Sequence, residues 1–209
     1  SAIHTFQFSY SFVLFSSFLF SDSVYQAWKS FSWEWADSDK NRAKKIMQIA
    51  KIKTADFFIT NPGEYLTKSS IPLKFPLFIK PVKGGDSIGV DKNSIVLNFK
   101  SFKAKVLDIK INQNSSSLVE TYLAGKEYSV GIFENSIDGT ITAMPIEIIV
   151  KKNVNGHCIL DFDVKKNDEE EVVLVSDKKI SKKLTEIAKN SFVALGGKSL
   201  GRIDIKMEH

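Results

Sequence analysis

The residues best suited to chemistry lie in the stretch FPLFIKPVKGGDSIGV, residues 75–90. Its apolar start predicts a buried strand that ends at Lys80. Gly84, Gly85 and Ser87 follow in a loop that would offer backbone N–H groups. Lysine supplies a point charge and glycines let the main chain approach a ligand closely, so the stretch is suited to holding a polyphosphate. The same glycine pair is also typical of a simple hairpin turn.

Other charged residues stand on or beside apolar strands. They are Glu120 in LVETYL, Glu127 at the start of the next strand, Lys165 after ILDFDV, and Arg202 with Asp204 in LGRIDIKM. Side chains two residues apart on a strand point the same way, so Arg202 and Asp204 should share one face. Each residue also has a plain interpretation: a solvated charge, an edge-strand lysine or a weak surface ion pair. Together with Lys80 and the glycine loop, the set indicates a cleft for a nucleotide and a metal ion.

A scaffold of helices and strands must position these residues. We expect helices over about 39–51, 98–110 and 181–195, and strands over 57–60, 75–79, 94–97, 118–123, 126–135, 141–150, 158–164, 171–175 and 200–207. This order predicts an α+β fold with an antiparallel meander in its second half.

The first helix is expected to carry an apolar face formed by Ile46, Met47, Ile49 and Ala50. The same helical pattern places Lys40, Lys44 and Lys45 largely opposite that face.

Composition sets the broad class. The chain has 209 residues and a net charge of +5, with lysines in small clusters and no long basic block, so a nucleic-acid-binding domain is the weakest alternative. The single Cys158 excludes an internal disulfide framework and suits a reducing compartment, from which we expect a cytoplasmic protein. His4, His157 and His209 are too dispersed in the sequence to indicate a zinc site.

The N-terminal stretch 6–20 is rich in phenylalanine. It is too short, and too often interrupted by serine, to span a membrane, and no Lys or Arg precedes it as in a signal peptide. Phe6, Phe8, Tyr10 and Phe12 alternate with polar residues, which predicts a half-buried strand and no membrane partner.

Four segments in this order resemble the ATP-grasp superfamily, and within it the D-alanine–D-alanine ligases: FPLFIKPVKGGDSIGV, LVETYLAGKEYSVGIF, DFDVKK and LGRIDI. The segment DKNRAKKIMQIAKIKTADFFI resembles the helix and strand that lead into that fold. The resemblance runs from about residue 21 to the end of the sequence. It implies two α+β lobes with antiparallel sheets that enclose a nucleotide cleft, ATP and Mg²⁺ as cofactors, and ADP-forming ligation of a carboxylate to an amine through an acyl phosphate.

The resemblance also divides the chain and implies its partners. Residues 1–38 would be an aromatic remnant of an N-terminal substrate domain, 39–115 the small lobe with the phosphate loop, and 116–209 the large lobe, incomplete at its C-terminus. The substrates would be a small-molecule carboxylate and amine, an amino acid or small peptide among them. No nucleic acid or membrane is implied as a partner, and a homodimer is compatible with the family.

The resemblance assigns the phosphate-binding residues by motif. Lys40, Lys80 and Lys165 would contact the ATP phosphates. The loop with Gly84 and Gly85 would cover these phosphates as a mobile flap, and its Ser87 would belong to the catalytic set.

The remaining roles follow in the same way. Glu120 and the backbone near Leu123 would hold the adenine edge, and Glu127 would accept hydrogen bonds from the ribose hydroxyls. Arg202 would stabilise the acyl phosphate and its tetrahedral successor, and Asp204 would be a magnesium ligand.

The sequence departs from the family pattern at three places. Asp86 stands where the peptide-forming ligases usually have serine, and Lys166 where they have an aromatic residue. Their Glu-x-Asn metal pair would follow about a dozen residues past Asp204, one short hairpin away, but the chain ends at His209. The chain would then be a fragment, or lack segments, or be a non-catalytic relative that only binds nucleotide.

Overall fold

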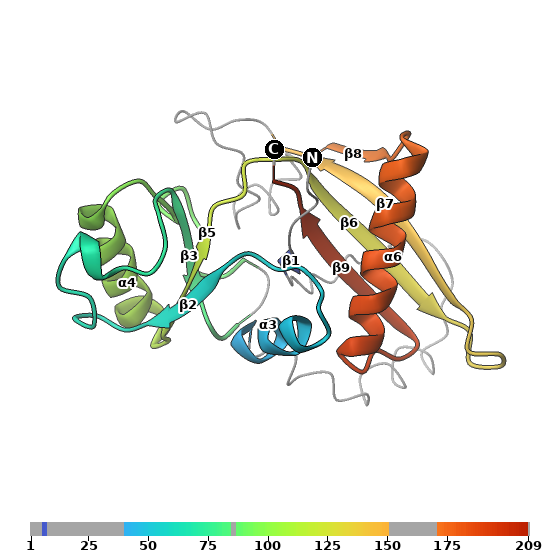
Figure 1. Cartoon of the computed structure of the whole chain (residues 1–209), viewed down its shortest axis with the longest axis horizontal. Helices are drawn as coiled ribbons and strands as arrows, with labels where there is room; N and C mark the ends of the chain where they lie inside the picture. Colours follow the sequence, from blue (N-terminus) through green and yellow to red (C-terminus); the bar gives the residue numbers. More distant parts are fainter. Residues whose placement is uncertain (1–5, 8–39, 85–86, 151–170, 209) are drawn as a thin grey trace.

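A computed structural model describes residues 6–7, 40–84, 87–150 and 171–208. In these residues the strands form a four-stranded sheet of order β2-β5-β3-β4 and a five-stranded sheet of order β1-β9-β6-β7-β8, and their pairings are antiparallel. The sheets lie in two lobes, the smaller around α4 and the larger around α6 (Figure 1). The predicted α+β class, with two lobes built on antiparallel sheets, is confirmed.

The smaller lobe packs one helix on one face of its sheet. Its elements are β2 (Phe57–Thr60), the 3₁₀ turn η1 (Lys68–Ser70), β3 (Leu77–Pro81), β4 (Ile95–Val96), α4 (Phe99–Gln113) and β5 (Ser117–Thr121). Leu77, Ile79 and Val119 are buried against Val106 and Ile109 of α4. Lys80 and Glu120, which directly follow Ile79 and Val119 on these strands, therefore point to the opposite face of the sheet.

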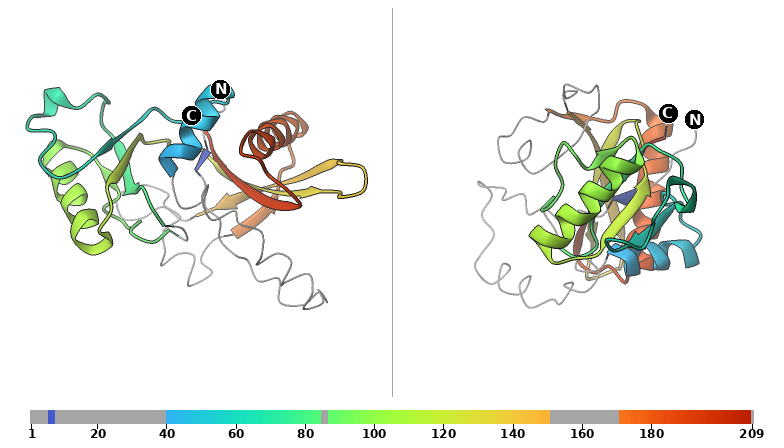
Figure 2. Two further views of the ribbon diagram at one scale, coloured as in Figure 1. Left: turned by 90° about the horizontal axis from the view of Figure 1, so that it is seen from below. Right: turned by 90° about the vertical axis from the view of Figure 1, so that its left-hand side faces the viewer.

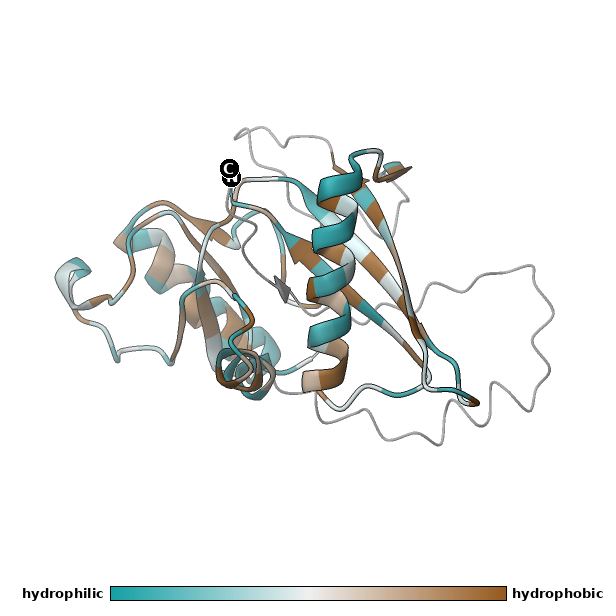
Figure 3. Cartoon of the chain, turned by 45° about the vertical axis from the view of Figure 1, so that its right-hand side comes forward, coloured by the Kyte–Doolittle hydropathy of each residue, from teal (hydrophilic) through white to brown (hydrophobic). Residues whose placement is uncertain are grey.

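The larger lobe covers its sheet in the same manner. Its elements are β1 (Phe6–Gln7), β6 (Glu127–Glu134), β7 (Ile141–Ile149), β8 (Glu171–Leu174), α6 (Lys178–Ala194) and β9 (Leu200–Lys206). Tyr128, Val130 and Ile203 form a buried core with Leu184 and Phe192 of α6. Figure 2 shows α6 lying along one face of this sheet, and Figure 3 shows a largely hydrophilic outer surface on the helix.

Helix α3 (Lys40–Ile49) lies between the two lobes (Figure 1). The apolar face predicted for it is wrong at two positions, because Ile49 and Ala50 are exposed. The prediction is confirmed for Met47, which is buried in the core of the larger lobe, and for Ile46, which packs against it; Ala43, which was not predicted, is buried there as well. Lys44, expected to lie opposite the apolar face, is only 4% exposed. Its ammonium group forms an ion pair with the Glu120 carboxylate of the smaller lobe.

Helix ends differ from the prediction for local reasons. Helix α6 begins at Lys178, three residues early, because the Asp177 carboxylate accepts hydrogen bonds from the backbone N–H groups of Lys179 and Ile180. Helix α4 begins after Asn98, whose side chain accepts from the Ser101 backbone N–H while the Ser101 side chain accepts from the Asn98 backbone N–H.

Three expectations are not decided by the described residues. The strand at 158–164 and the greater part of the N-terminal aromatic stretch lie outside them. The division at residue 115 stays a prediction, although the smaller sheet includes β5 and so extends to Thr121. Among the helices that the structure describes, none combines the length and the apolar character that a membrane crossing requires.

Candidate functional site

Two lysines and one glutamate form a buried charge cluster on the smaller sheet. The Glu120 carboxylate lies 2.5 Å from Lys44 Nζ and 2.6 Å from Lys80 Nζ. Phe78 of β3 is the register partner of Glu120, so Lys80, two residues further on, projects from the same face. The sheet thus supplies two members of the cluster, and α3 brings the third.

Burial and charge act in opposite directions on these groups. Burial alone would raise the pKa of Glu120, but the ammonium groups of Lys44 and Lys80 outweigh it and bring the pKa down to about 2. Burial lowers the pKa of Lys44, and Glu120 counteracts this in part. One carboxylate against two lysines leaves excess positive charge when all three are ionised. Such a site favours an anionic ligand.

Neighbouring groups hold the two ammonium groups in place. Lys44 Nζ lies 4.9 Å from the ring centroid of Phe57 and donates a hydrogen bond to the Thr54 hydroxyl. Lys80 Nζ lies 5.7 Å from the ring centroid of Phe78. Aromatic faces attract cations, so the lysines are oriented by the sheet as well as by Glu120.

Lys40 ties the start of α3 to the predicted phosphate loop. Its backbone N–H donates to the Val82 carbonyl at 3.3 Å, and its ammonium group donates to the Gly84 carbonyl. Gly84 has a φ of +95°, which glycine adopts readily. The structure therefore brings Lys40 and Gly84 together just beyond the strand that carries Lys80. Gly85 lies outside the described residues.

A second polar group lies on the face of the larger sheet turned away from α6. Arg202 Nε is 3.1 Å from Asp204 Oδ1, which also accepts a 2.7 Å hydrogen bond from the Ser129 hydroxyl. Beside them, Lys206 Nζ lies 3.0 Å from Glu127 Oε2. The prediction that Arg202 and Asp204 share one face is confirmed. They are no ordinary surface pair, since Asp204 is 3% exposed.

The donor set of this second group fits a magnesium ion only in part. Asp204 offers one carboxylate, and Ser129 and Arg202 already engage it. Magnesium binds through one or two protein carboxylates plus phosphate oxygens and water. The described part of the chain contains no group of three or more His, Cys, Asp or Glu residues that could hold a metal by itself.

A short connector joins the two polar groups. Residues 122–126 run from the end of β5, next to Glu120, to the start of β6 at Glu127. Leu123 is half-buried within this connector. Lys165, the third predicted phosphate ligand, lies outside the described residues.

The sequence interpretation missed Lys44 as a site residue. Its signal was its position four residues after Lys40, which places both on one side of a helix. Ser129 was missed as well, and it could have been found because it precedes Val130 on a strand that alternates polar and apolar residues.

Comparison with known proteins gives matches over most of the chain. A family model described as "D-ala D-ala ligase C-terminus" matches residues 41–209. The D-alanine–D-alanine ligase of Aquifex aeolicus is 31% identical over 173 residues, which cover 81% of this chain and 53% of that protein. The ligase of the same name from Blochmanniella floridana is 30% identical over 171 residues, or 80% and 47%. The chain thus spans about half the length of these curated relatives.

Solved structures of the same fold are similar at lower identity. A D-alanine–D-alanine ligase from Bacillus anthracis complexed with ATP has a TM-score of 0.61 at 20% identity, covering 83% of this chain and 52% of that one. An L-amino acid ligase from Bacillus licheniformis has a TM-score of 0.62 at 16% identity, covering 83% and 38%. These likenesses support the ATP-grasp fold.

Proposed function

The chain belongs to the family of D-alanine–D-alanine ligase C-terminal domains, and on this premise we propose that it is the ATP-binding part of an ADP-forming carboxylate–amine ligase. The observation that carries the proposal is the Lys44–Glu120–Lys80 cluster, with Lys40 and the glycine loop just beyond it. A buried excess of positive charge at the end of a strand suits the phosphates of a nucleotide.

Several residues of the candidate site have a proposed role in binding ATP. Lys40 and Lys80 would neutralise phosphate oxygens, and Glu120 would hold Lys80 in place until the nucleotide arrives. Glu120 and the backbone of Leu123 would bind the adenine edge, and Glu127 would accept hydrogen bonds from the ribose hydroxyls. When bound, ATP would supply the phosphoryl group that activates the carboxylate.

Residues of the larger sheet would stabilise the negative charge that develops during the reaction. Arg202 lies beside Asp204 on β9, and its guanidinium would stabilise an acyl phosphate and its tetrahedral successor. Asp204 would provide one ligand to Mg²⁺, with phosphate oxygens and water supplying others.

The substrate class is an amino acid or small peptide. The curated relatives are named as D-alanine–D-alanine ligases, which makes D-alanine the first amino acid to test. Asp86 and Lys166 replace residues typical of that family, so other amino acids belong in the same panel. A cytoplasmic location, supported by the single Cys158, and a homodimer are further proposals.

Phosphate release tests the proposed reaction. The longest natural chain that contains this segment, incubated with Mg-ATP, should release phosphate only when an acceptor amino acid is present. The Lys80→Ala variant should lose this release, whereas Lys45→Ala, which removes an exposed lysine of α3, should keep it. ATP binding without amino-acid-dependent phosphate release would leave only nucleotide binding and overturn the ligase.

A further inference from the structure

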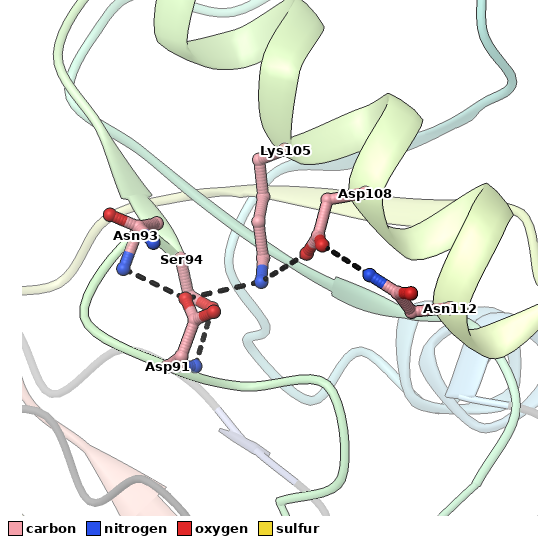
Figure 4. Close-up of polar contacts among 6 residues, drawn as sticks. All are labelled: Asp91, Asn93, Ser94, Lys105, Asp108 and Asn112. Atoms are coloured by element: carbon pink, nitrogen blue, oxygen red, sulfur yellow. Dashed lines mark hydrogen bonds and ion pairs between the residues drawn. The ribbon is translucent and has the colours of Figure 1, made fainter.

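Lys105 of α4 buries its ammonium group between two carboxylates (Figure 4). Its Nζ lies 3.1 Å from Asp91 and 3.1 Å from Asp108, and its side chain is 2% exposed. The two carboxylates are alike in exposure, at 48% and 43%. A buried ammonium requires such partners, because an unpaired charge inside a protein is strongly unfavourable.

The two carboxylates come from different parts of the smaller lobe. Asp108 is one turn along the same helix and has a second partner there, the Asn112 side chain at 2.6 Å. Asp91 lies in the segment 87–94, between the predicted phosphate loop and β4. There it accepts a hydrogen bond from the Asn93 backbone N–H at 2.8 Å. Of the two ion pairs of Lys105, the one with Asp91 is therefore the one that joins the segment to the helix.

The segment 87–94 is also organised from within. The Asp91 backbone N–H donates to the Ser94 hydroxyl, and the Ser94 backbone N–H donates to the Asp91 carbonyl. The Ser94 carbonyl in turn accepts from the Ile79 backbone N–H on β3. At the other end of the connection between β3 and β4, Lys40 holds the Gly84 carbonyl. Lys105 thus secures the side of the phosphate loop that Lys40 does not reach.

We propose that Lys105 is a positioning residue which, through Asp91, holds the segment 87–94, and with it Ser87, in place for a nucleotide phosphate. The consequence for the nucleotide rests on the proposed function, but the holding of the segment does not. Lys105 itself touches no substrate in this scheme and acts only through Asp91.

Asp91→Asn and Asp108→Asn form a matched pair that separates positioning from stability. Each variant removes one of two carboxylates at the same distance from the same ammonium group. Each leaves an amide oxygen that can still accept from Asn93 or Asn112. If Lys105 serves stability alone, the two variants should behave alike.

Hydrogen–deuterium exchange and Mg-ATP binding, measured on the full chain, test this proposal. Asp91→Asn should speed amide exchange in peptides covering 87–94 and weaken Mg-ATP binding about tenfold, while Asp108→Asn should do neither. Equal effects in both variants, or an Asp91→Asn segment that exchanges as in the wild type, would overturn it. Lys105→Arg should keep the slow exchange that Lys105→Met loses, since arginine can still bind a carboxylate. A wild type that binds no Mg-ATP refutes the proposed function instead, and the exchange comparison then decides alone whether Lys105 holds the segment.

Discussion

Glu120 determines the electrostatics of the site. A carboxylate buried to this extent would normally be neutral, yet two lysines keep it ionised. In return, Glu120 offsets the cost of burying Lys44 and Lys80, which face each other across it. Removing one member of such a cluster is therefore costlier than removing an exposed charge, commonly by about 3–5 kcal/mol.

The low pKa of Glu120 makes stability depend on pH. Its folded pKa of about 2 lies below the ordinary 4.5, so its ionisation stabilises the fold above pH 4.5, and this contribution is lost as pH falls toward 2. Glu120→Gln removes the contribution. Urea unfolding should show a larger difference in the free energy of unfolding between wild type and Glu120→Gln at pH 6 than at pH 2.5. A difference that stays constant with pH would contradict the assignment.

Lys44 supplies the excess positive charge of the cluster. In Lys44→Met, Glu120 and Lys80 would neutralise each other, and Glu120 would hold Lys80 more firmly because it no longer also pairs with Lys44. Affinity for a fluorescent ATP analogue should fall about tenfold, the effect of losing roughly one charge-assisted interaction. The neighbouring Lys45→Met should bind within twofold of wild type, about 0.4 kcal/mol. Unchanged affinity in Lys44→Met would remove this lysine from the site.

At the scale of elements, alternation along strands made much of the site predictable. Arg202 and Asp204 share a face because they are two residues apart, and Ile203 and Ile205 between and beside them fill the core. The orientation of α3 was not predictable in this way. Its sequence shows four apolar residues near the C-terminal end, but two of them are exposed. The burial of Lys44 depends on Glu120, a partner that is remote in sequence.

The connector between the lobes depends on Gly125. A Cβ added there would lie 2.4 Å from the Met207 carbonyl oxygen, which also accepts the hydrogen bond of the Gly125 N–H. Gly125→Ala should cost about 1–3 kcal/mol, as overpacking commonly does. Gly131→Ala on β6, where no atom of the described chain lies within 4 Å of an added Cβ, should cost less. Thermal unfolding of the two variants measures this difference, and equal melting temperatures would contradict it.

At the scale of the whole molecule, the site joins two lobes. Helix α3 packs Ala43 and Met47 into the larger core while its Lys44 reaches Glu120 of the smaller sheet. The family segments in the sequence predicted the two antiparallel lobes and their order along the chain. They did not predict that Glu120 would be enclosed by two lysines, because that geometry arises only when α3 docks against both lobes.

Calorimetric titration of the protein with Mg-ATP tests whether the Lys44–Glu120–Lys80 cluster is a nucleotide site. Wild type should bind Mg-ATP, Lys80→Ala should bind at least about tenfold more weakly because it loses a charge-assisted contact to phosphate, and Lys45→Ala should match wild type. Circular dichroism of each variant would establish that it is folded. Equal affinities of wild type and folded Lys80→Ala, or no binding by wild type, would contradict the nucleotide site.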